Sequence, residues 1–208
     1  GRPLSLVAAR SAYPSKAQQN QGPPALRVDS EDSEAIAASI QVHGPIDLLV
    51  VNSGVLGAGD PLTVDPDTID RPFRINIHAP YHAAVEAART MRDGGRIIFI
   101  GSVNADRMPM TGLAAYAASK AALQRMAKGL ARDFGARGIT VNVVQPGPTD
   151  TDMNPADGPL HTTMHSFMAI KRHAHADEVA AMVAWLGQRP EAAKVTGTAL
   201  SIDGGFSA

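Results

Sequence analysis

Runs of consecutive apolar residues recur along the chain and predict the strands of a buried sheet. Three of them, IDLLVVN at 46–52, RIIFIGS at 96–102 and ITVNVVQPG at 139–147, are apolar at nearly every position. Strands that are hydrophobic on both faces are typical of a parallel sheet with helices on either side. Shorter apolar runs predict further strands at 4–9, 25–28 and 198–203.

The segments between these runs have the spacing of helices, which we expect at 31–43, 67–92, 112–135, 160–170 and 176–187. Pro72 and Pro80 should break or kink the second helix, whereas the glycine-rich stretch 54–59 should be a loop. Alternating strands and helices predict an α/β fold, a three-layer, doubly wound parallel sheet of the Rossmann type. We expect residues 1–208 to form one domain, with ligand-binding loops at the carboxyl ends of the strands.

Composition and charge exclude several classes of protein. The chain has 19 basic and 20 acidic residues and a net charge of −1, which offers no excess of positive charge for nucleic acid or an anionic membrane. No apolar stretch approaches the roughly 20 residues that span a bilayer. The absence of cysteine excludes disulfides and thiolate metal sites, and it is compatible with a reducing compartment. We therefore expect a cytoplasmic protein.

Tyr116 and Lys120 give the strongest chemical signal. Residues at i and i+4 of a helix lie on one face, so the phenol and the ammonium can approach each other. A phenol has a pKa of about 10, and a neighbouring cation lowers it. Charges about 4 Å apart interact by roughly 4 kcal/mol at an effective dielectric constant of about 20. The pair therefore predicts a tyrosine that serves as general acid and base near neutral pH.

Ser102 adds a third group at the carboxyl end of the strand at 96–102. A hydroxyl there can hydrogen-bond a substrate carbonyl or the alkoxide formed from it. A Tyr–Lys pair alone is often a lysine whose stem covers a half-buried tyrosine. The strand-end serine and the α/β order favour catalysis over that alternative.

The segment 102–123, SVNADRMPMTGLAAYAASKAAL, resembles the active-site segment of the short-chain dehydrogenase/reductase family. Further segments resemble the family in the same order, so that the resemblance covers about residues 1–205; they are VNSG at 51–54, RINIHAP around Asn76, NVVQPGPTDT at 142–151, RHAHADEVAAMVAWL and VTGTALSIDGG. The resemblance implies an oxidoreductase that transfers a hydride between a nicotinamide cofactor and a small carbonyl or alcohol substrate.

The resemblance also implies a role for each matching residue. Tyr116 would exchange the proton with the substrate oxygen, and Lys120 would lower the pKa of Tyr116 and bind the nicotinamide ribose. Ser102 would hold the substrate oxygen, and Asn76 would position a water molecule in the proton relay.

Cofactor contacts follow from the same resemblance. The family places a discriminating residue at the end of its second strand, where this chain has Arg10 and then Ser11, with no acidic residue for a ribose 2′-hydroxyl. An arginine there favours a 2′-phosphate, so we expect NADP(H) rather than NAD(H); a solvated surface cation is the alternative. Asp29 resembles the adenine-binding aspartate and is equally compatible with a turn. The other expected contacts are Ser30, Asn52, Ser53, Gly54, Tyr116, Lys120, Pro146, Gly147, Thr149 and Thr151.

One family element has no counterpart in the chain. A first strand followed by TGxxxGxG, with the cofactor pyrophosphate at the next helix N-terminus, should precede residue 1. GVLGAG at 54–59 does not replace it, because no helix follows immediately. The missing βα unit would have about 30 residues, and its central strand would contribute roughly 10 kcal/mol of burial. We expect upstream sequence, because these residues alone should not hold the fold unless a partner or a rearrangement fills the gap, and they lack the phosphate-binding turn for the cofactor.

Residues 152–175 resemble the substrate lid of the family. His161 and His165 are four residues apart there, but no carboxylate completes an HExxH arrangement, so we predict no metal site. The alanine-rich helices at about 78–92 and 112–133 resemble those that pair between subunits in the family, which predicts a homodimer or homotetramer.

A second function, of a different class, follows from a resemblance to bacterial family members that bind cyclic-di-GMP. INIHAPYHAAVEAAR, GSVNADRMPM and HSFMAIKRH carry this resemblance. It implies a regulator in which Arg107, Lys171 or Arg172 would lie near the phosphates. Both functions can coexist, and a fold that retains neither is the third alternative.

Overall fold

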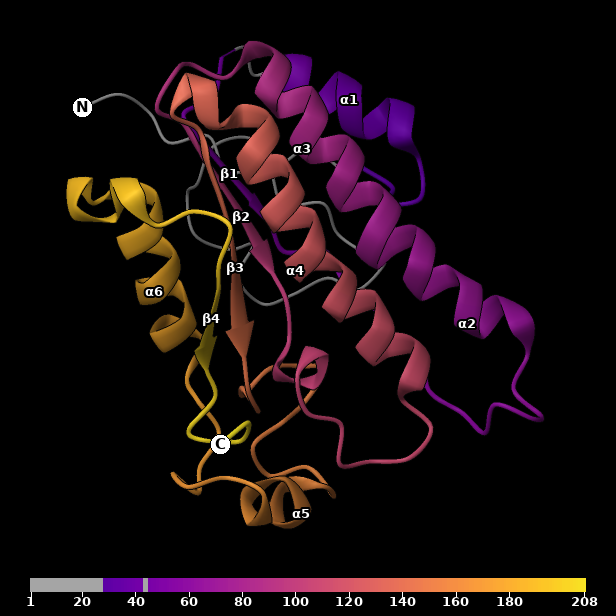
Figure 1. Cartoon of the computed structure of the whole chain (residues 1–208). Coiled ribbons are helices and arrows are strands. Elements are labelled where there is room, and N and C mark those ends of the chain that lie inside the picture. Colours follow the sequence, from indigo (N-terminus) through magenta and orange to yellow (C-terminus); the bar gives the residue numbers. More distant parts are fainter. Residues whose placement is uncertain (1–27, 43–44) are drawn as a thin grey trace.

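Three strands that are apolar on both faces form the centre of the structure, a computed structural model that describes residues 28–42 and 45–208. In this part of the chain one parallel sheet has the order β1-β2-β3-β4 (Figure 1). The strands are β1 (Leu48–Val51), β2 (Arg96–Ile100), β3 (Thr140–Pro146) and β4 (Ala199–Ile202). The strand predicted at 4–9, most of the one predicted at 25–28, Arg10 and Ser11 lie outside the described residues.

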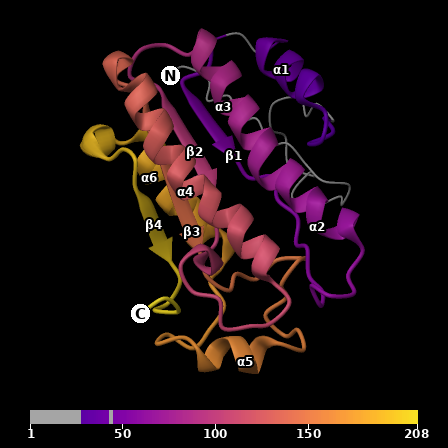
Figure 2. The ribbon, with the colours of Figure 1, turned by 45° about the vertical axis from the view of Figure 1, so that its right-hand side comes forward.

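Helices cover both faces of this sheet (Figure 2). One face carries α1 (Ser33–Val42), α3 (Ala79–Thr90) and α4 (Ala114–Phe134), and the other carries α6 (Ala176–Gln188). The remaining helices and turns are α2 (Pro66–Phe73), η2 (Arg74–His78), η3 (Val103–Ala105), η4 (Gly135–Arg137), α5 (His161–Ser166) and η5 (Pro190–Lys194). The predicted three-layer α/β fold is therefore confirmed. None of the helices in the described ranges has the length and apolar character needed to cross a membrane.

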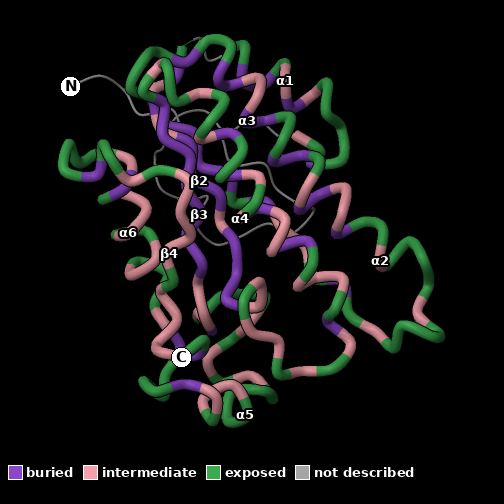
Figure 3. The backbone as a smooth tube through the Cα atoms, viewed as in Figure 1, coloured by how far each residue is buried: buried purple, intermediate pink, exposed green. Residues whose placement is uncertain are grey.

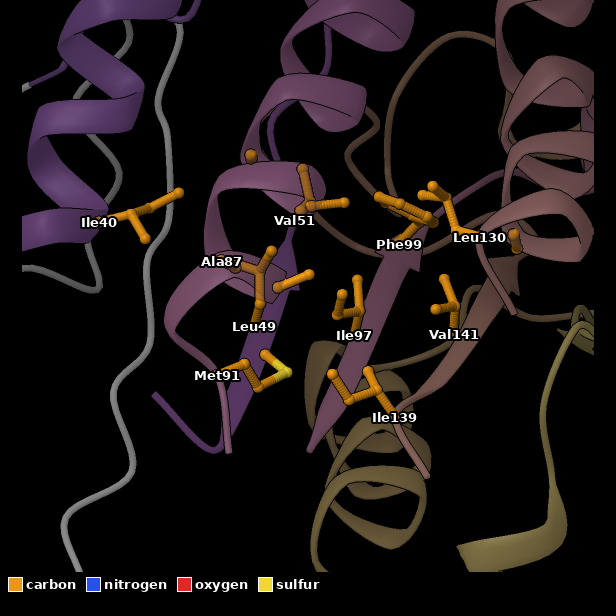
Figure 4. Packing of buried hydrophobic residues seen from close by; sticks show 14 of the residues in the cluster. Ile40, Leu49, Val51, Ala87, Met91, Ile97, Phe99, Leu130, Ile139 and Val141 are labelled. Atoms are coloured by element: carbon orange, nitrogen blue, oxygen red, sulfur yellow. The ribbon is translucent and has the colours of Figure 1, made fainter. Parts of the chain in front are cut away.

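Alternate residues of each strand pack into different cores, because successive side chains point to opposite faces of a sheet. Leu49, Ile97, Phe99 and Val141 belong to the core beneath α1, α3 and α4 (Figure 4). Their neighbours along the strands pack against α6; they are Leu48, Val50, Ile98 and Val144. Burial is concentrated in the strands, whereas α2 and α5 are largely exposed (Figure 3). The unbroken apolar runs of the sequence thus reflect burial on both sides.

The helix predicted at 67–92 is continuous but changes its hydrogen bonding in the middle. Pro80 has no N–H to donate to the carbonyl of Asn76, four residues earlier. The chain responds with the π-helical turn η2, in which the N–H of Ala79 bonds to the carbonyl of Arg74, five residues back. Pro72 lies inside α2 and does not end it. The predicted break is therefore a π turn in the middle of a continuous helix, and Asn76 lies within that turn.

The helix predicted at 160–170 is shorter than expected. It ends at Ser166, and Ile170 donates its N–H to the carbonyl of Gly204 instead of continuing the helix (2.8 Å). A hydrogen bond to the C-terminal turn therefore replaces the helical hydrogen bond that Ile170 would otherwise make.

Replacing Phe99 by alanine should lower the free energy of unfolding by about 3–5 kcal/mol, because the ring is completely buried between the sheet and its helices. Urea-induced unfolding monitored by circular dichroism measures the change. Leu62→Ala is the control, since Leu62 is 91% exposed and its truncation should cost less than about 0.5 kcal/mol. Equal midpoints for the two variants would contradict the described core.

Candidate active site

The candidate site lies at the edge of the sheet where the parallel strands end. Asn52–Gly54 follow β1, Ser102 follows β2, and Gly147 follows β3. Parallel pairing brings these ends to one edge, and α5 and the C-terminal turn lie at the same edge (Figure 1). The topology thus gathers segments about 50 residues apart in the sequence.

Ser102 and Tyr116 meet at this edge, as predicted. Ser102 is buried and begins η3, where its Oγ accepts the N–H of Asn104 (3.2 Å). The phenol of Tyr116, in the first turn of α4, shares a hydrogen bond with the Ser102 side chain. Burial raises the pKa of Tyr116, and the hydrogen bond with Ser102 lowers it by less. Tyr116 is therefore held protonated at neutral pH.

Lys120 is almost fully buried, and its Nζ donates to the carbonyl oxygen of Ile100 at the end of β2 (3.0 Å). Burial lowers the pKa of Lys120 to about 8. The predicted lowering of the Tyr116 pKa by Lys120 is wrong for the protein alone, because burial of the phenol prevails and the ammonium does not contribute to the shift. The i, i+4 spacing sets the helix face, but the lysine reaches past the tyrosine to the strand.

Asn76 is completely buried and its amide is saturated. Oδ1 accepts the N–H of Val55 (2.9 Å), and Nδ2 donates to the Val55 carbonyl and to Ser119 Oγ (3.0 Å each). The main-chain carbonyl of Asn76 faces Pro80 in the sequence, which cannot donate to it. Both N–H groups of the Asn76 side-chain amide are therefore used by acceptors within the protein.

Ser119 is a residue that the sequence analysis missed. It is fully buried, accepts from Asn76, and donates to the carbonyl of Tyr116 (2.7 Å). It therefore connects the π turn to the helix that carries Tyr116 and Lys120. A hydroxyl three residues after the tyrosine was the available signal, but only the tertiary structure shows that it faces Asn76.

Gly54 allows the loop after β1 to approach these groups closely. A Cβ at this position would lie 3.1 Å from Lys120 Nζ and 3.6 Å from Asn76 Oδ1. Four segments thus converge on one site: the β1 loop, η2, the end of β2 and α4.

Two predicted cofactor residues carry buried hydroxyls that have no hydrogen-bond partner among the described residues. These are Ser30 and Ser53, at 2% and 6% exposure. A buried polar atom without a partner is unfavourable, so both positions suit a polar ligand. Gly147 is required by close packing, because a Cβ there would lie 2.7 Å from the Cα of Asp203. The two serines therefore fit a nucleotide ligand, whereas packing against Asp203 is enough to explain why position 147 is a glycine.

Other predicted cofactor residues make local contacts. Asp29 accepts the N–H of Glu31 (2.9 Å), which is the turn interaction named as its alternative role. Thr149 Oγ1 donates to the carbonyl of Gly147 (3.0 Å), and Thr151 Oγ1 accepts the N–H of Asn154 (3.2 Å). Asn52 is exposed just after β1, and Pro146 is the last residue of β3. These contacts order the loops in which a cofactor would be held.

The arginines expected near cyclic-di-GMP phosphates already have partners. Arg107 donates to the carbonyls of Phe206 and Phe167, and Arg172 forms a bidentate pair with Glu178 (2.7 Å for each bond). Lys171 is exposed. The geometry therefore does not favour phosphate binding by either arginine.

Histidines gather in the predicted lid. His165 Nε2 and His173 Nδ1 are 2.9 Å apart, and the rings of His161 and His165 meet edge to face. Burial lowers the pKa of His173. These rings contact one another, and in the described residues no group of three or more histidine, aspartate or glutamate side chains is arranged to hold a metal ion.

Comparisons with known proteins agree with this geometry. The family model described as enoyl-(acyl carrier protein) reductase matches residues 8–207. A short-chain dehydrogenase/reductase from Serratia marcescens BCRC 10948 is 47% identical, with a TM-score of 0.85 over 88% of this chain and 76% of that chain. The chain belongs to the short-chain dehydrogenase/reductase family. Members of this family are NAD(P)-dependent oxidoreductases, as the sequence motifs predicted.

Two further matches concern ligands. The cyclic-di-GMP-binding biofilm dispersal mediator protein of Escherichia coli (strain K12) is 60% identical over 190 residues, which are 91% of this chain and 80% of that protein. The crystal structure of BdcA in complex with NADPH is 61% identical, with a TM-score of 0.85 over 88% of this chain and 75% of that chain.

Replacing Lys120 by methionine should remove a pH-dependent contribution to stability. The pKa of Lys120 is about 8 in the folded protein against an ordinary value of 10.5. Between these values the unfolded chain binds more protons, so the stability of the wild type rises with pH there, by about 3 kcal/mol in total.

Urea unfolding at intervals from pH 7 to 10.5 tests this expectation. The difference in unfolding free energy between wild type and Lys120→Met should move in favour of the wild type as the pH rises. Lys128→Met, at an exposed position of the same helix, controls for the loss of a positive charge. A constant difference for Lys120→Met would show that the ammonium is not buried.

Proposed function

We propose that the protein is an NADP(H)-dependent carbonyl reductase, or the corresponding alcohol dehydrogenase, with Tyr116 as general acid and base. The observation that carries this proposal is the convergence of Tyr116 with buried Ser102 and buried Lys120, whose Nζ bonds to the carbonyl of Ile100 at the sheet edge. Lys120, Asn76 and Gly54 are adjacent. The NADPH complex of BdcA and the expected role of Arg10 toward a 2′-phosphate support the choice of NADP(H).

The cofactor would be held by the segments that end at this edge. Ser30 and Ser53 offer hydroxyls that have no partner within residues 28–42 and 45–208, and the loops at Asn52–Gly54 and 146–151 would flank the cofactor. When bound, NADP(H) supplies or accepts the hydride.

The protein residues control the proton. Ser102 donates its hydroxyl to the substrate oxygen and orients it toward Tyr116. Negative charge develops on that oxygen during reduction, and the Tyr116 phenol gives up its proton to it. Because burial raises the pKa of Tyr116, the phenol is protonated at neutral pH, which suits the acid role and hence reduction.

Two further residues would act on the phenolate that this proton transfer leaves, by stabilising its charge and by returning its proton. The Lys120 ammonium, one helical turn away, is predominantly charged at neutral pH and stabilises negative charge developing nearby. Asn76 would hold a water molecule at its main-chain carbonyl, through which a proton returns from solvent. Its side chain instead fixes the Val55 loop and Ser119.

We further propose that residues 1–208 form one cofactor-binding domain with a substrate lid at about 152–175, and that it works in the cytoplasm as a homodimer or homotetramer. The alanines of α3 pack into the core, so they do not argue for an interface. On α4, Ala114 and Ala118 are exposed, which supports contact between subunits through this helix.

Replacing Tyr116 by phenylalanine should lower kcat for NADPH-dependent reduction by about 10²–10⁴-fold, because the proton donor is lost while the ring remains. The assay follows NADPH oxidation with a panel of carbonyl substrates, using the protein produced from its complete gene. The dissociation constant for NADPH should stay within about twofold, since the phenol is not the main anchor of the cofactor. Tyr81→Phe, at an exposed position, is the control. Undiminished turnover in Tyr116→Phe would refute the proposed role.

A second candidate function is binding of cyclic-di-GMP, and the name of the 60% identical Escherichia coli protein favours it. Isothermal titration calorimetry with cyclic-di-GMP, in the presence and absence of NADPH, tests it. Binding that NADPH weakens would indicate a shared site, and binding that NADPH leaves unchanged would indicate a separate one. No heat of binding in either titration would exclude this function.

A further inference from the structure

Asp106, Gln124 and Gln145 form a closed ring of hydrogen bonds that neither the sequence motifs nor the proposed reaction uses. Gln124 Nε2 donates to Asp106 Oδ1 (2.8 Å) and to Gln145 Oε1 (2.7 Å). Gln145 Nε2 donates to Asp106 Oδ2 (2.5 Å). The carboxylate thus accepts from both amides, and the amides are joined to each other.

The ring joins three elements that build the candidate site. Asp106 directly follows η3, the turn that begins at Ser102. Gln124 lies on α4, one helical turn beyond Lys120 and two beyond Tyr116. Gln145 is the second-last residue of β3, and its side chain lies beside Gly101, where a Cβ would be 3.3 Å from Gln145 Cγ.

The ring suits a carboxylate at position 106. A carboxylate has acceptors only, so both of its oxygens can face amide N–H groups. An alkyl side chain at this position would leave those two N–H groups without their acceptor. Gln145 is completely buried and Asp106 is exposed, so the carboxylate is the partner that Gln145 Nε2 has at the surface end of the ring. The ring should therefore hold its geometry as a unit.

We propose that Asp106 is a positioning residue, which through Gln124 and Gln145 holds the Ser102 turn against α4 so that Ser102 stays on the Tyr116 phenol. This inference rests on the proposed function. The turn is fixed at its start to β3, since Gly101 donates its N–H to the carbonyl of Val144 (2.8 Å). At its end it is fixed by the ring. Ser102 lies between these two attachments, and its hydroxyl must point at a group on a different element.

A merely structural ring and a positioning ring have different consequences. If the ring only stabilised the fold, its loss would lower the unfolding midpoint and leave the properties of Tyr116 unchanged. If it positions Ser102, its loss weakens the hydrogen bond that lowers the pKa of Tyr116. The phenol should then titrate at higher pH, and proton transfer should slow.

The test compares Asp106→Ala, which removes the acceptor, with Gln124→Met, which removes the α4 arm while keeping a good helix former. Asp133→Ala is the matched control, because Asp133 is an exposed aspartate near the end of α4. The first readout is ultraviolet difference titration of tyrosinate, with the signal of Tyr116 obtained by subtracting Tyr116→Phe. The chain has three tyrosines in all. This readout needs no turnover.

The second readout is steady-state kinetics of carbonyl reduction. We expect Asp106→Ala and Gln124→Met to raise the pH at which Tyr116 titrates and to lower kcat by on the order of tenfold, with the KM for NADPH within about twofold. Asp133→Ala should match the wild type in both measurements.

Unchanged Tyr116 titration in the folded Asp106→Ala and Gln124→Met variants would overturn the positioning role, whatever their stability. If Asp106→Ala does not fold, Gln124→Met alone decides. Full activity in Tyr116→Phe would instead refute the proposed function. In that case the titration still decides whether the ring holds Ser102 on the phenol.

Discussion

Burial of β1, β2 and β3 on both faces is the constraint on which the rest of the structure depends. Each of these strands places alternate residues into the core under α3 and α4 and into the core under α6. A parallel sheet with crossover helices on both sides buries both apolar faces of such strands. Parallel pairing in turn brings the ends of the strands to one edge, and the candidate site is built from the residues that follow them.

The same burial determines the electrostatics of the site. It raises the pKa of Tyr116 and lowers that of Lys120, so each group is pushed toward its neutral form. In the protein alone the pair is therefore not a phenolate beside an ammonium. It is a protonated phenol next to a lysine that still carries its charge at neutral pH. This state is ready to donate a proton, and the ammonium stabilises the charge that the donation leaves behind.

Main-chain groups, rather than other side chains, orient much of the site. Lys120 is fixed by the carbonyl of Ile100, Asn76 by both polar groups of Val55, and Ser119 by the carbonyl of Tyr116. Backbone atoms at strand ends and helix starts move little, because the sheet and the helices hold them. Ser102 differs, since its turn is held at one end by the hydrogen bond of Gly101 to β3 and at the other by the side chains of Asp106, Gln124 and Gln145.

The sequence by itself determined the parallel sheet and the helices that cover it, because unbroken apolar runs and their spacing have few alternatives. It also singled out Ser102, Tyr116, Lys120 and Asn76, whose residue types and order resemble a known family. The roles of Ser119 and Asp106 needed the tertiary structure, since Ser119 bonds to Asn76, 43 residues away, and Asp106 bonds to Gln145, 39 residues away. The tertiary structure also decided that Lys120 bonds to the carbonyl of Ile100 and that the pKa of Tyr116 is raised rather than lowered. Helical spacing shows which side chains share a face, but only packing shows how far water is excluded from them.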